Sequence, residues 1–378
     1  MQNKRRILFF IESLAGGGAE KVLVTLLKHL DPSRFDITLC CVTRVGKYLD
    51  DVPSFVDFRY LLPAPETLKG LPLLFYKIKY KLIYNLPPKW TYWLFIPKGR
   101  DVEIAYIEGN ATRILAGSSN QRALKVAWVH TDLEKNRGAF VLGKSYRFFD
   151  RIVTVSKAAQ KSFEAAFPEL APRVVTVYNP IDREAILQDA ADNDDIPERK
   201  PGVLRLVSVG RLAPIKAYDR LLRVFLRLCD HYPQLELWML GEGEERERLW
   251  RFILVNDLSD SVRLWGFVDN PCRFLSKCDL FVCSSLAEGL STAATEALVL
   301  GIPVVTTDCS GMKELFGEEA CGVIVDNDEN ALFRGLESVL DDPVLLDRMA
   351  TSAKRRGAHF SLERLMPPIE ALLEQASS

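Results

Sequence analysis

Short apolar runs alternate along the chain with longer segments in which apolar residues recur every three or four positions. The run at 6–11 is followed, after a glycine-rich turn, by an amphipathic pattern at 19–30. Further runs follow at 35–42, 102–107, 124–130, 151–156 and 174–179. Near-continuous Val, Ile and Leu runs separated by helices are typical of buried parallel strands. The first half is therefore predicted to form a parallel sheet covered on both faces.

The same alternation resumes after an acidic, proline-bearing stretch at 188–202, which we interpret as a linker. Strands are predicted at 204–210, 235–241, 262–267, 279–285, 302–308 and 322–326, with helices over 219–229, 244–256, near 292–300 and onward to about 357. The expected fold is α/β, with two doubly wound Rossmann-like domains, 1–187 and 203–357, facing a central cleft. The last segment, 358–378, with a helix at about 362–375, is expected to pack back on the first domain.

Composition narrows the class of protein. The chain has 378 residues, with 49 Lys and Arg against 50 Asp and Glu, so there is no global basic footprint for nucleic acid. No apolar stretch reaches the roughly 18 residues that a membrane helix needs. The eight cysteines contain no C-x-x-C pair and none has a histidine at metal-ligand spacing, which favours reduced thiols and a cytoplasmic protein.

One motif is interpreted as a chance match. Gly138–Ser145 fits the Walker A pattern, but that loop needs a strand directly before it, and the preceding residues DLEKNR do not form one. We predict an ordinary helix that carries Lys144 on its surface.

The glycines Gly16, Gly17 and Gly18 lie between the first strand and the first helix. They would let the backbone approach a ligand, with the helix N-terminus offering N–H groups to a phosphate; a tight turn is the alternative. The motif is not G-x-G-x-x-G, because Lys21 takes the third glycine position. The second strand also ends in Thr43-Arg44 and lacks the acidic residue that would hold the ribose of NAD, which disfavours a nicotinamide dehydrogenase.

Two loops of the second half carry candidate binding groups. Arg211 and Lys216 follow the strand at 204–210, where two cations would suit a diphosphate, unless they are simply solvated. Glu288 lies in a later loop, and Ser291 or Thr292 is a natural N-cap for the helix that follows. Glu296, one turn into that helix, could accept two vicinal hydroxyls; a solvated helix face is the alternative.

These motifs together resemble a known family. Glu288 and Glu296 in EGLS…EAL…PVV, with SVGRL…K, LGEGEERERL, GGGAEKV and VYNPID, are similar to the retaining glycosyltransferases of family 4, which have the GT-B fold. The matches run from Gly16 to Lys313 in the order of the family.

The resemblance implies roles for individual residues. Glu296 would bind the ribose hydroxyls and Glu288 a hydroxyl of the donor sugar, while Arg211 and Lys216 would neutralise the diphosphate. His130, Arg211, Lys216 and Glu288 would form the catalytic set, with His130 facing the reacting sugar. The other donor-binding positions implied are Gly16, Gly17, Gly18, Gly210, Gly266, Phe267, Val268, Gly289, Leu290, Ser291 and Thr292.

The implied reaction is a retaining transfer from a nucleotide sugar, expected to be a UDP-sugar, without a metal or other cofactor. The acceptor would be a saccharide, lipid-linked as in bacterial surface polysaccharide synthesis. Leu290 and Ser291 replace the aromatic residue and proline frequent in the family, which leaves the donor sugar open. A nucleotide-sugar epimerase and a non-catalytic sugar-nucleotide-binding subunit are the rival interpretations.

Residues 67–100 concentrate cations and aromatic rings. They contain seven Lys or Arg residues, eight aromatic residues and no Asp or Glu. Such a mixture suits the interface of an anionic bilayer, although some of the rings must belong to the core. Peripheral attachment to the inner face of the plasma membrane is therefore expected.

Overall fold

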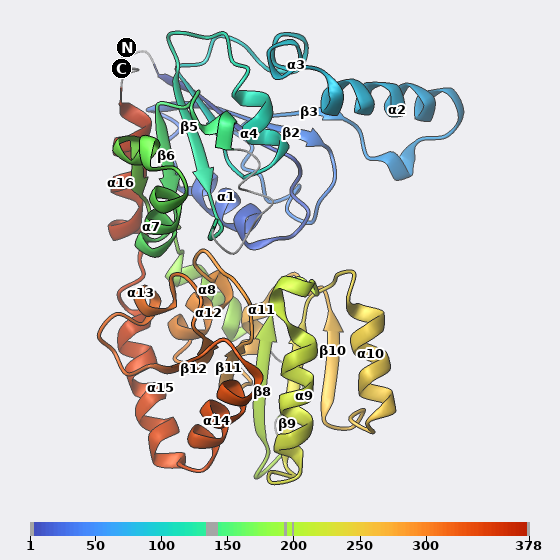
Figure 1. The fold of residues 1–378 in the computed structure, drawn as a ribbon, viewed down its shortest axis with the longest axis vertical. Helices are drawn as coiled ribbons and strands as arrows, with labels where there is room; N and C mark the ends of the chain where they lie inside the picture. The colour runs from blue at the N-terminus through green and yellow to red at the C-terminus, as the bar shows by residue number, and fades with distance from the viewer. Residues whose placement is uncertain (1–3, 134–142, 193–194, 199, 376–378) are drawn as a thin grey trace. The chain divides into compact units, whose positions relative to one another are not determined.

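The computed structural model describes residues 4–133, 143–192, 195–198 and 200–375, and Figure 1 traces the chain through them. The chain divides into two compact units: Met1–Pro180 together with Glu363–Ser378, and Ile181–Leu362.

A seven-stranded parallel sheet forms the centre of the first unit. Its strand order is β3-β2-β1-β4-β5-β6-β7, which is the Rossmann order extended by one strand. The strands are β1 (Arg5–Ile11), β2 (Phe35–Thr43), β3 (Asp57–Leu62), β4 (Val102–Ala105), β5 (Leu124–Val129), β6 (Arg151–Thr154) and β7 (Val174–Thr176). From β1 the strand order runs to one side through β2 and β3, and from β4 it runs to the other side through β5, β6 and β7. The carboxyl ends of β1 and β4 therefore flank the switch point, which is where such sheets bind ligands.

Helices bury the apolar residues of this sheet. They are α1 (Gly18–His29), α2 (Gly70–Asn85), α3 (Pro88–Phe95), α4 (Asn110–Leu115), α6 (Gly143–Tyr146), α7 (Lys157–Ala166) and α16 (Leu362–Glu374), with short 3-10 turns η1 (Pro65–Thr67) and η2 (Pro168–Arg173). Leu8 and Phe10 of β1 pack in one core cluster with Ile83 of α2, Tyr92 of α3 and Phe163 of α7.

The return of the last helix to the first unit is confirmed. The Arg34 guanidinium forms ion pairs with Glu370 and Glu374 of α16, and Arg5 Nε donates to the Leu373 carbonyl at 3.2 Å. Ile369, Leu372 and Leu373 are buried on its inner side.

The second unit repeats the architecture with six parallel strands in the order β10-β9-β8-β11-β12-β13. These are β8 (Leu204–Val209), β9 (Leu235–Leu240), β10 (Val262–Gly266), β11 (Leu280–Cys283), β12 (Val304–Thr307) and β13 (Gly322–Val325). Its helices are α8 (Arg183–Ala191), α9 (Tyr218–Cys229), α10 (Arg246–Val255), α11 (Pro271–Leu275), α12 (Thr292–Val299), α13 (Met312–Phe316), α14 (Glu329–Leu340) and α15 (Pro343–Gly357), with the 3-10 turn η3 (Pro214–Lys216). One core cluster joins the sheet to α9, α10 and α14, and a second joins it to α11, α12 and α13. The predicted pair of Rossmann-like domains is thus confirmed.

Several segments differ from the sequence expectation. The predicted linker at 188–202 begins inside α8, because Asp182 caps that helix and α8 packs on α11 and α12. The unit boundary therefore lies at Pro180, earlier than the predicted residue 187. β3, α2 and α3 were not anticipated.

The structure also bears on the Walker look-alike, the cysteines and the question of membrane-spanning helices. Lys144 is exposed on α6, while Gly138–Leu142 of the Walker look-alike lie outside the described residues. All eight cysteines are free thiols. Among the described residues, no helix is both long and apolar enough to cross a membrane.

Candidate active site

The switch point of the second sheet lies between β8 and β11, and the loops that follow these strands carry most of the predicted donor residues. The loop after β8 contains Gly210 and Arg211 and ends in η3 with Lys216. The loop after β11 contains Glu288 and leads into α12. The backbones of the two loops are joined, since Leu286 N donates to the Ile215 carbonyl at 2.8 Å.

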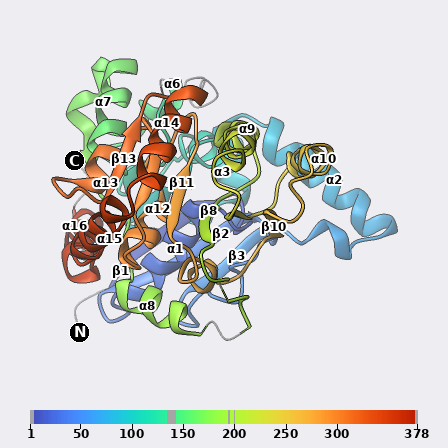
Figure 2. The ribbon, with the colours of Figure 1, turned by 90° about the horizontal axis from the view of Figure 1, so that it is seen from below.

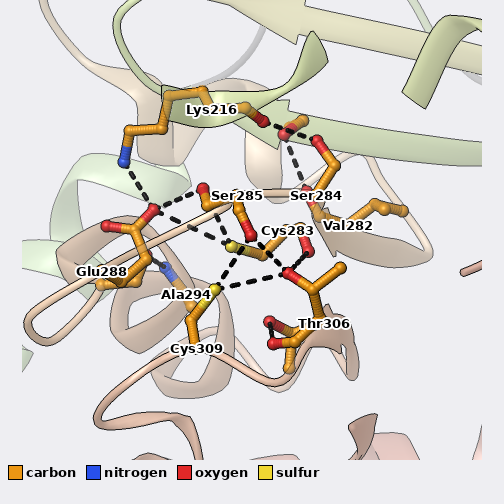
Figure 3. A network of polar contacts seen from close by, with 12 residues as sticks. Lys216, Val282, Cys283, Ser284, Ser285, Glu288, Ala294, Thr306 and Cys309 are labelled. Carbon is orange, nitrogen blue, oxygen red and sulfur yellow. Dashed lines mark hydrogen bonds and ion pairs between the residues drawn. The ribbon is translucent and has the colours of Figure 1, made fainter. Parts of the chain in front are cut away.

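Lys216 and Glu288 form an ion pair across these loops (Figure 3). The distance from Lys216 Nζ to Glu288 Oε1 is 2.6 Å, and the two side chains are 23% and 11% exposed. The same carboxylate oxygen accepts a 2.6 Å hydrogen bond from Ser285 Oγ. One oxygen of Glu288 is thereby fixed by two donors, so the orientation of the carboxylate is set by the protein.

This pairing keeps Lys216 charged despite its position. Burial by itself lowers the pKa of Lys216, but the Glu288 carboxylate outweighs it, and the net pKa lies above the ordinary lysine value. Tyr218, next to the pair, has its pKa raised to about 12 by burial, so it stays a neutral phenol. The site therefore holds a permanent cation at the carboxyl edge of the sheet.

A buried network supports the loop that carries Glu288. Ser284 Oγ donates to the Lys216 carbonyl at 2.8 Å, and Thr307 Oγ1 donates to the Ser285 carbonyl at 2.7 Å. Cys309 Sγ also donates to that carbonyl, at 2.9 Å. The Ser285 carbonyl, three residues before Glu288, is thus held by two donors, so the loop offers its ligand a preorganised surface.

Arg220 of α9 ties the same loop to the end of β13. Its guanidinium donates to the Ser284 carbonyl and, at 2.8 Å, to Asn327 Oδ1. Asn327 Nδ2 in turn donates to the Leu286 carbonyl at 3.0 Å. Three segments far apart in sequence are joined at this point.

The N-terminus of α12 adds backbone donors. Ser291 is the N-cap, and its Oγ accepts from Ala294 N at 3.3 Å. The first-turn N–H groups of a helix have no intrahelical acceptor, so those near Thr292 can receive an anion. Glu296 lies one turn further on and is 5% exposed, which excludes the alternative of a solvated face.

Glycines bring the strand ends close together. A Cβ on Gly241 would lie 2.0 Å from the Gly210 carbonyl oxygen, and Gly241 N donates to the Gly266 carbonyl at 2.7 Å. The loops after β8, β9 and β10 therefore touch through backbone, which only glycine permits at Gly241, where φ is 143°. Val268, in the predicted base-contacting stretch with Phe267, packs partly buried against the core.

Arg211 differs from Lys216 in having no side-chain partner among the described residues. It is exposed, and within the described residues its guanidinium makes no ion pair or hydrogen bond. Its position in the Gly210 loop leaves it available to a ligand.

The first unit places His130 at the carboxyl end of β5. His130 Nε2 lies 2.9 Å from the Tyr106 carbonyl, which can only accept, so Nε2 carries the proton and Nδ1 is the acceptor of the neutral ring. Burial lowers the pKa of His130, and the charge of Glu108 offsets this only in part. His130 is therefore neutral near pH 7.

Glu108, which sequence analysis missed, organises this edge of the first sheet. Its Oε1 accepts from His130 N at 2.6 Å, from Thr131 N at 2.8 Å and from Thr131 Oγ1 at 3.0 Å. The available signal was its place directly after a predicted strand, at the edge where ligands bind. Ser285, Thr307 and Arg220 of the second unit were missed as well, and only Ser285 had such a signal.

The glycine triplet forms the start of α1. Gly16 has φ 115°, Gly17 is the N-cap and Gly18 is the first helical residue. A Cβ on Gly17 would lie 2.4 Å from Glu20 Oε2, so the side chain of Glu20 folds over the helix start. The triplet is thus a helix N-terminus beside a carboxylate.

Comparison with known proteins identifies the family to which this chain is similar. The family described as "Glycosyltransferase Family 4" matches residues 16–185, and "Glycosyl transferases group 1" matches residues 190–356. A Campylobacter jejuni protein, named as N-acetylgalactosamine-N,N'-diacetylbacillosaminyl-diphospho-undecaprenol 4-alpha-N-acetylgalactosaminyltransferase, is 30% identical over 94% of this chain and 96% of its own length.

Solved structures agree on the fold. Anabaena HepE, in complex with UDP and glucose, superposes with a TM-score of 0.73 at 19% identity, covering 98% of this chain and 99% of HepE. Sucrose-phosphate synthase from Thermosynechococcus elongatus gives 0.77 at 16% identity, with 98% of each chain covered. The two Rossmann-like units thus define a glycosyltransferase of the GT-B type. More narrowly, the chain belongs to glycosyltransferase family 4.

Proposed function

We propose that this glycosyltransferase is a retaining, metal-independent enzyme. It moves a hexose or N-acetylhexosamine from a UDP-sugar to a lipid-linked saccharide in bacterial surface polysaccharide synthesis. The observation that carries the proposal is the ion pair of Lys216 and Glu288 at the switch point of the second unit, next to the N-terminus of α12. It brings together a fixed cation, a fixed carboxylate and backbone donors.

These groups suit a diphosphate leaving group. Negative charge grows on the diphosphate as the bond to the sugar breaks, and preorganised donors stabilise that charge without reorganising. Lys216 provides a point charge and Arg211 a two-pronged donor that nothing in the described protein occupies. The N–H groups around Leu290, Ser291 and Thr292 would complete the diphosphate site.

The two carboxylates suit the sugars of the donor. The free oxygen of Glu288 can accept from a hydroxyl of the transferred sugar while Lys216 and Ser285 hold the other oxygen. Glu296 would accept from the ribose hydroxyls. In the first unit, neutral His130 would contact the transferred sugar through Nδ1. We name no protein nucleophile.

The donor and acceptor are inferred from chemistry and relatives. HepE was solved with UDP and glucose, and the Campylobacter relative is named for an acceptor linked to diphospho-undecaprenol. We extend the UDP-sugar and the lipid-linked acceptor from those proteins to this one. A lipid-linked acceptor also implies work at a membrane surface, which we place on the cytoplasmic side.

A thermal-shift series would test the donor site. UDP and the matching UDP-sugar should raise the melting temperature, whereas GDP-sugars should not. Glu296→Ala should weaken UDP binding by about 1.5–3 kcal/mol, because the ribose hydroxyls lose a charged acceptor. An unchanged UDP dissociation constant in this variant would remove Glu296 from the site.

Product analysis would test the reaction. The anomeric configuration of the product, read by NMR, should equal that of the donor, and turnover should survive EDTA. An inverted product, or activity lost in EDTA and restored by magnesium or manganese, would contradict the mechanism. Formation of an epimeric UDP-sugar from donor alone would favour the rival epimerase, and UDP binding without any turnover would favour a binding subunit.

A further inference from the structure

The helix α2 carries an apolar stripe on its solvent side. Leu71, Leu74, Phe75, Ile78 and Leu82 recur at the spacing of one helix face, and each is between 43% and 69% exposed. Figures 1 and 2 both show α2 reaching out beyond the sheet of its own unit. A continuous exposed apolar stripe on a soluble unit marks a surface that binds something apolar.

The opposite side of α2 is already occupied by its own unit. Ile83 is buried in the core, and Tyr76, Tyr80 and Tyr84 form a ladder with ring centroids 6.1 Å and 4.4 Å apart. Tyr76 and Tyr84 pack against the core cluster. The two faces of α2 thus have separate tasks, and the stripe is not needed for the fold of the unit.

The carboxyl end of the helix is anchored from α4. Arg113 donates to the carbonyls of Leu86 at 3.1 Å and Ile83 at 3.0 Å, which satisfies terminal carbonyls of α2. The helix is held at its base while its outer side stays open.

Lysines border the stripe on both edges. With 100° per residue, Lys81 lies along one edge and Lys79 along the other, and Lys77 lies beyond Lys81, toward Tyr84. Beyond Lys79 lies α3, whose Phe95 ring is 5.6 Å from Lys79 Nζ, and α3 exposes Trp90 and Trp93. Not every cation of residues 67–100 belongs to this surface, because Lys98 Nζ bonds to the Tyr92 carbonyl and Arg100 is only 11% exposed near Asp36 and Asp57.

We propose that α2 docks in the plane of an anionic bilayer, with the stripe among the acyl chains and Lys77, Lys79 and Lys81 at the lipid phosphates. Charge and shape support this docking, because apolar residues bordered by lysines, with tryptophans beside them, match the layers of such an interface. The 16 residues of α2 span about 24 Å, less than the roughly 30 Å of a hydrocarbon core. The helix therefore lies on the membrane. This inference rests on the lipid-linked acceptor of the proposed function and assigns the surface that would reach it.

Vesicle co-sedimentation of the full chain tests the proposal. The vesicles are pure phosphatidylcholine, or equal parts of phosphatidylcholine and phosphatidylglycerol. One variant combines Leu74→Gln, Phe75→Gln and Ile78→Gln, and a second combines Lys77→Gln, Lys79→Gln and Lys81→Gln. A matched control combines Leu254→Gln and Val255→Gln, two exposed apolar residues of α10 in the other unit.

The native chain should bind the anionic vesicles far better than the neutral ones. The lysine variant should have a partition coefficient on the order of 100-fold lower than the native chain, because each lysine near an anionic bilayer contributes a factor of about five. High salt should release most of the native protein, because the Debye length shrinks. The stripe variant should lose the fraction that resists salt, and the α10 control should bind like the native chain.

Other outcomes would overturn the proposal. Equal binding by all variants, or no binding of the native chain, would exclude α2 as a membrane surface. A dimer in sedimentation velocity that the stripe variant converts to monomer would assign the stripe to a second copy of the chain. UDP affinity is measured on every variant, so a chain that binds UDP but no vesicle contradicts only this inference, whereas one that binds vesicles but no UDP contradicts the proposed function.

Discussion

The switch points of the two sheets occupy the same place in the same strand order, yet their side chains differ in kind. In the second unit, the edge holds Lys216 paired with Glu288, the exposed Arg211 and the start of α12. In the first unit, the edge holds Glu108 and a neutral His130, and Glu20 folds over the start of α1. The strand order decides where a ligand binds, and the residue types decide which ligand.

The difference matches two kinds of substrate. Cations and helix N–H groups recognise a diphosphate, whereas carboxylates and a neutral imidazole accept hydrogen bonds from hydroxyl groups. One fold used twice can thus present a cationic edge in one unit and an edge of hydrogen-bond acceptors in the other, by its loops alone. The predictions below test this division.

Loss of Lys216 should have the largest effect. Lys216→Ala removes the fixed cation and should lower kcat on the order of 10³-fold, as for the loss of one preorganised donor. It also leaves the Glu288 carboxylate buried without its partner, at a cost of about 3 kcal/mol of folding free energy. Steady-state kinetics and thermal unfolding measure the two effects.

A double variant separates the effect on turnover from the effect on stability. Lys216→Met combined with Glu288→Gln should recover most of the stability and none of the turnover. Lys144→Ala on α6 serves as the matched control and should leave kcat nearly unchanged. If Lys144→Ala were the more damaging substitution, the chain would be a nucleoside triphosphatase and the assignment of the cleft loops would fail.

Arg211→Ala should have an intermediate effect, and it should lower donor affinity without lowering stability. Because the Arg211 side chain is exposed and forms no hydrogen bond or ion pair with the described residues, its loss should leave the melting temperature in place. Donor affinity should fall about tenfold to hundredfold, from the loss of charge-assisted hydrogen bonds. Isothermal titration with UDP gives the affinity; a lower melting temperature at unchanged affinity would make Arg211 a structural residue.

In the first unit, protonation of His130 should make the folding stability depend on pH. The folded pKa of His130 lies below the ordinary value of about 6.5, so the unfolded chain takes up this proton first as the pH falls. Stability should therefore decrease from about pH 6.5 down to the folded pKa and be fully present above that window. Glu108→Gln removes the charge that supports protonation and should lower the pKa of His130 further.

NMR titration of the imidazole and urea unfolding at several pH values measure this effect. His130→Gln, which cannot titrate, should remove its share of the slope. A rise in the His130 pKa in Glu108→Gln would show that the contact of His130 with Glu108 is not the electrostatic one described.

Substitution of Ala217 should have the smallest effect, on the free energy of unfolding alone. It has φ 48° directly after Lys216, a conformation that costs a residue with a Cβ about 1 kcal/mol. Ala217→Gly should raise the free energy of unfolding by up to about 1 kcal/mol without altering donor affinity. A loss of donor affinity in this variant would mean that backbone strain at Ala217 positions Lys216.

Strands could be predicted where burial on both faces requires unbroken apolar runs. β1 at Arg5–Ile11 and β9 at Leu235–Leu240 lie within a residue of the expected ranges. β3 was missed because Asp57–Leu62 is an edge strand with several exposed side chains. α2 was missed because its apolar residues lie on its solvent side as well as toward the core, so the sequence has no polar face to reveal the helix.

The site could be predicted as far as residue types and loop positions allow. Lys216 and Glu288 were both expected to contact a ligand, but their bond to each other joins positions 72 residues apart, and no local pattern signals it. Arg220 and Thr307 act on backbone carbonyls, a role that many polar residues can fill and that the sequence does not mark.

The return of α16 has a consequence for biosynthesis. The second unit is contiguous, whereas the first needs α16, which the ribosome makes only after residues 181–362. The nascent first unit must therefore wait, with the surface that Ile369 and Leu372 will cover still open, while the second unit is translated and can fold. Order of synthesis and order of completion are opposite in this chain, so the first unit is the one expected to depend on chaperones.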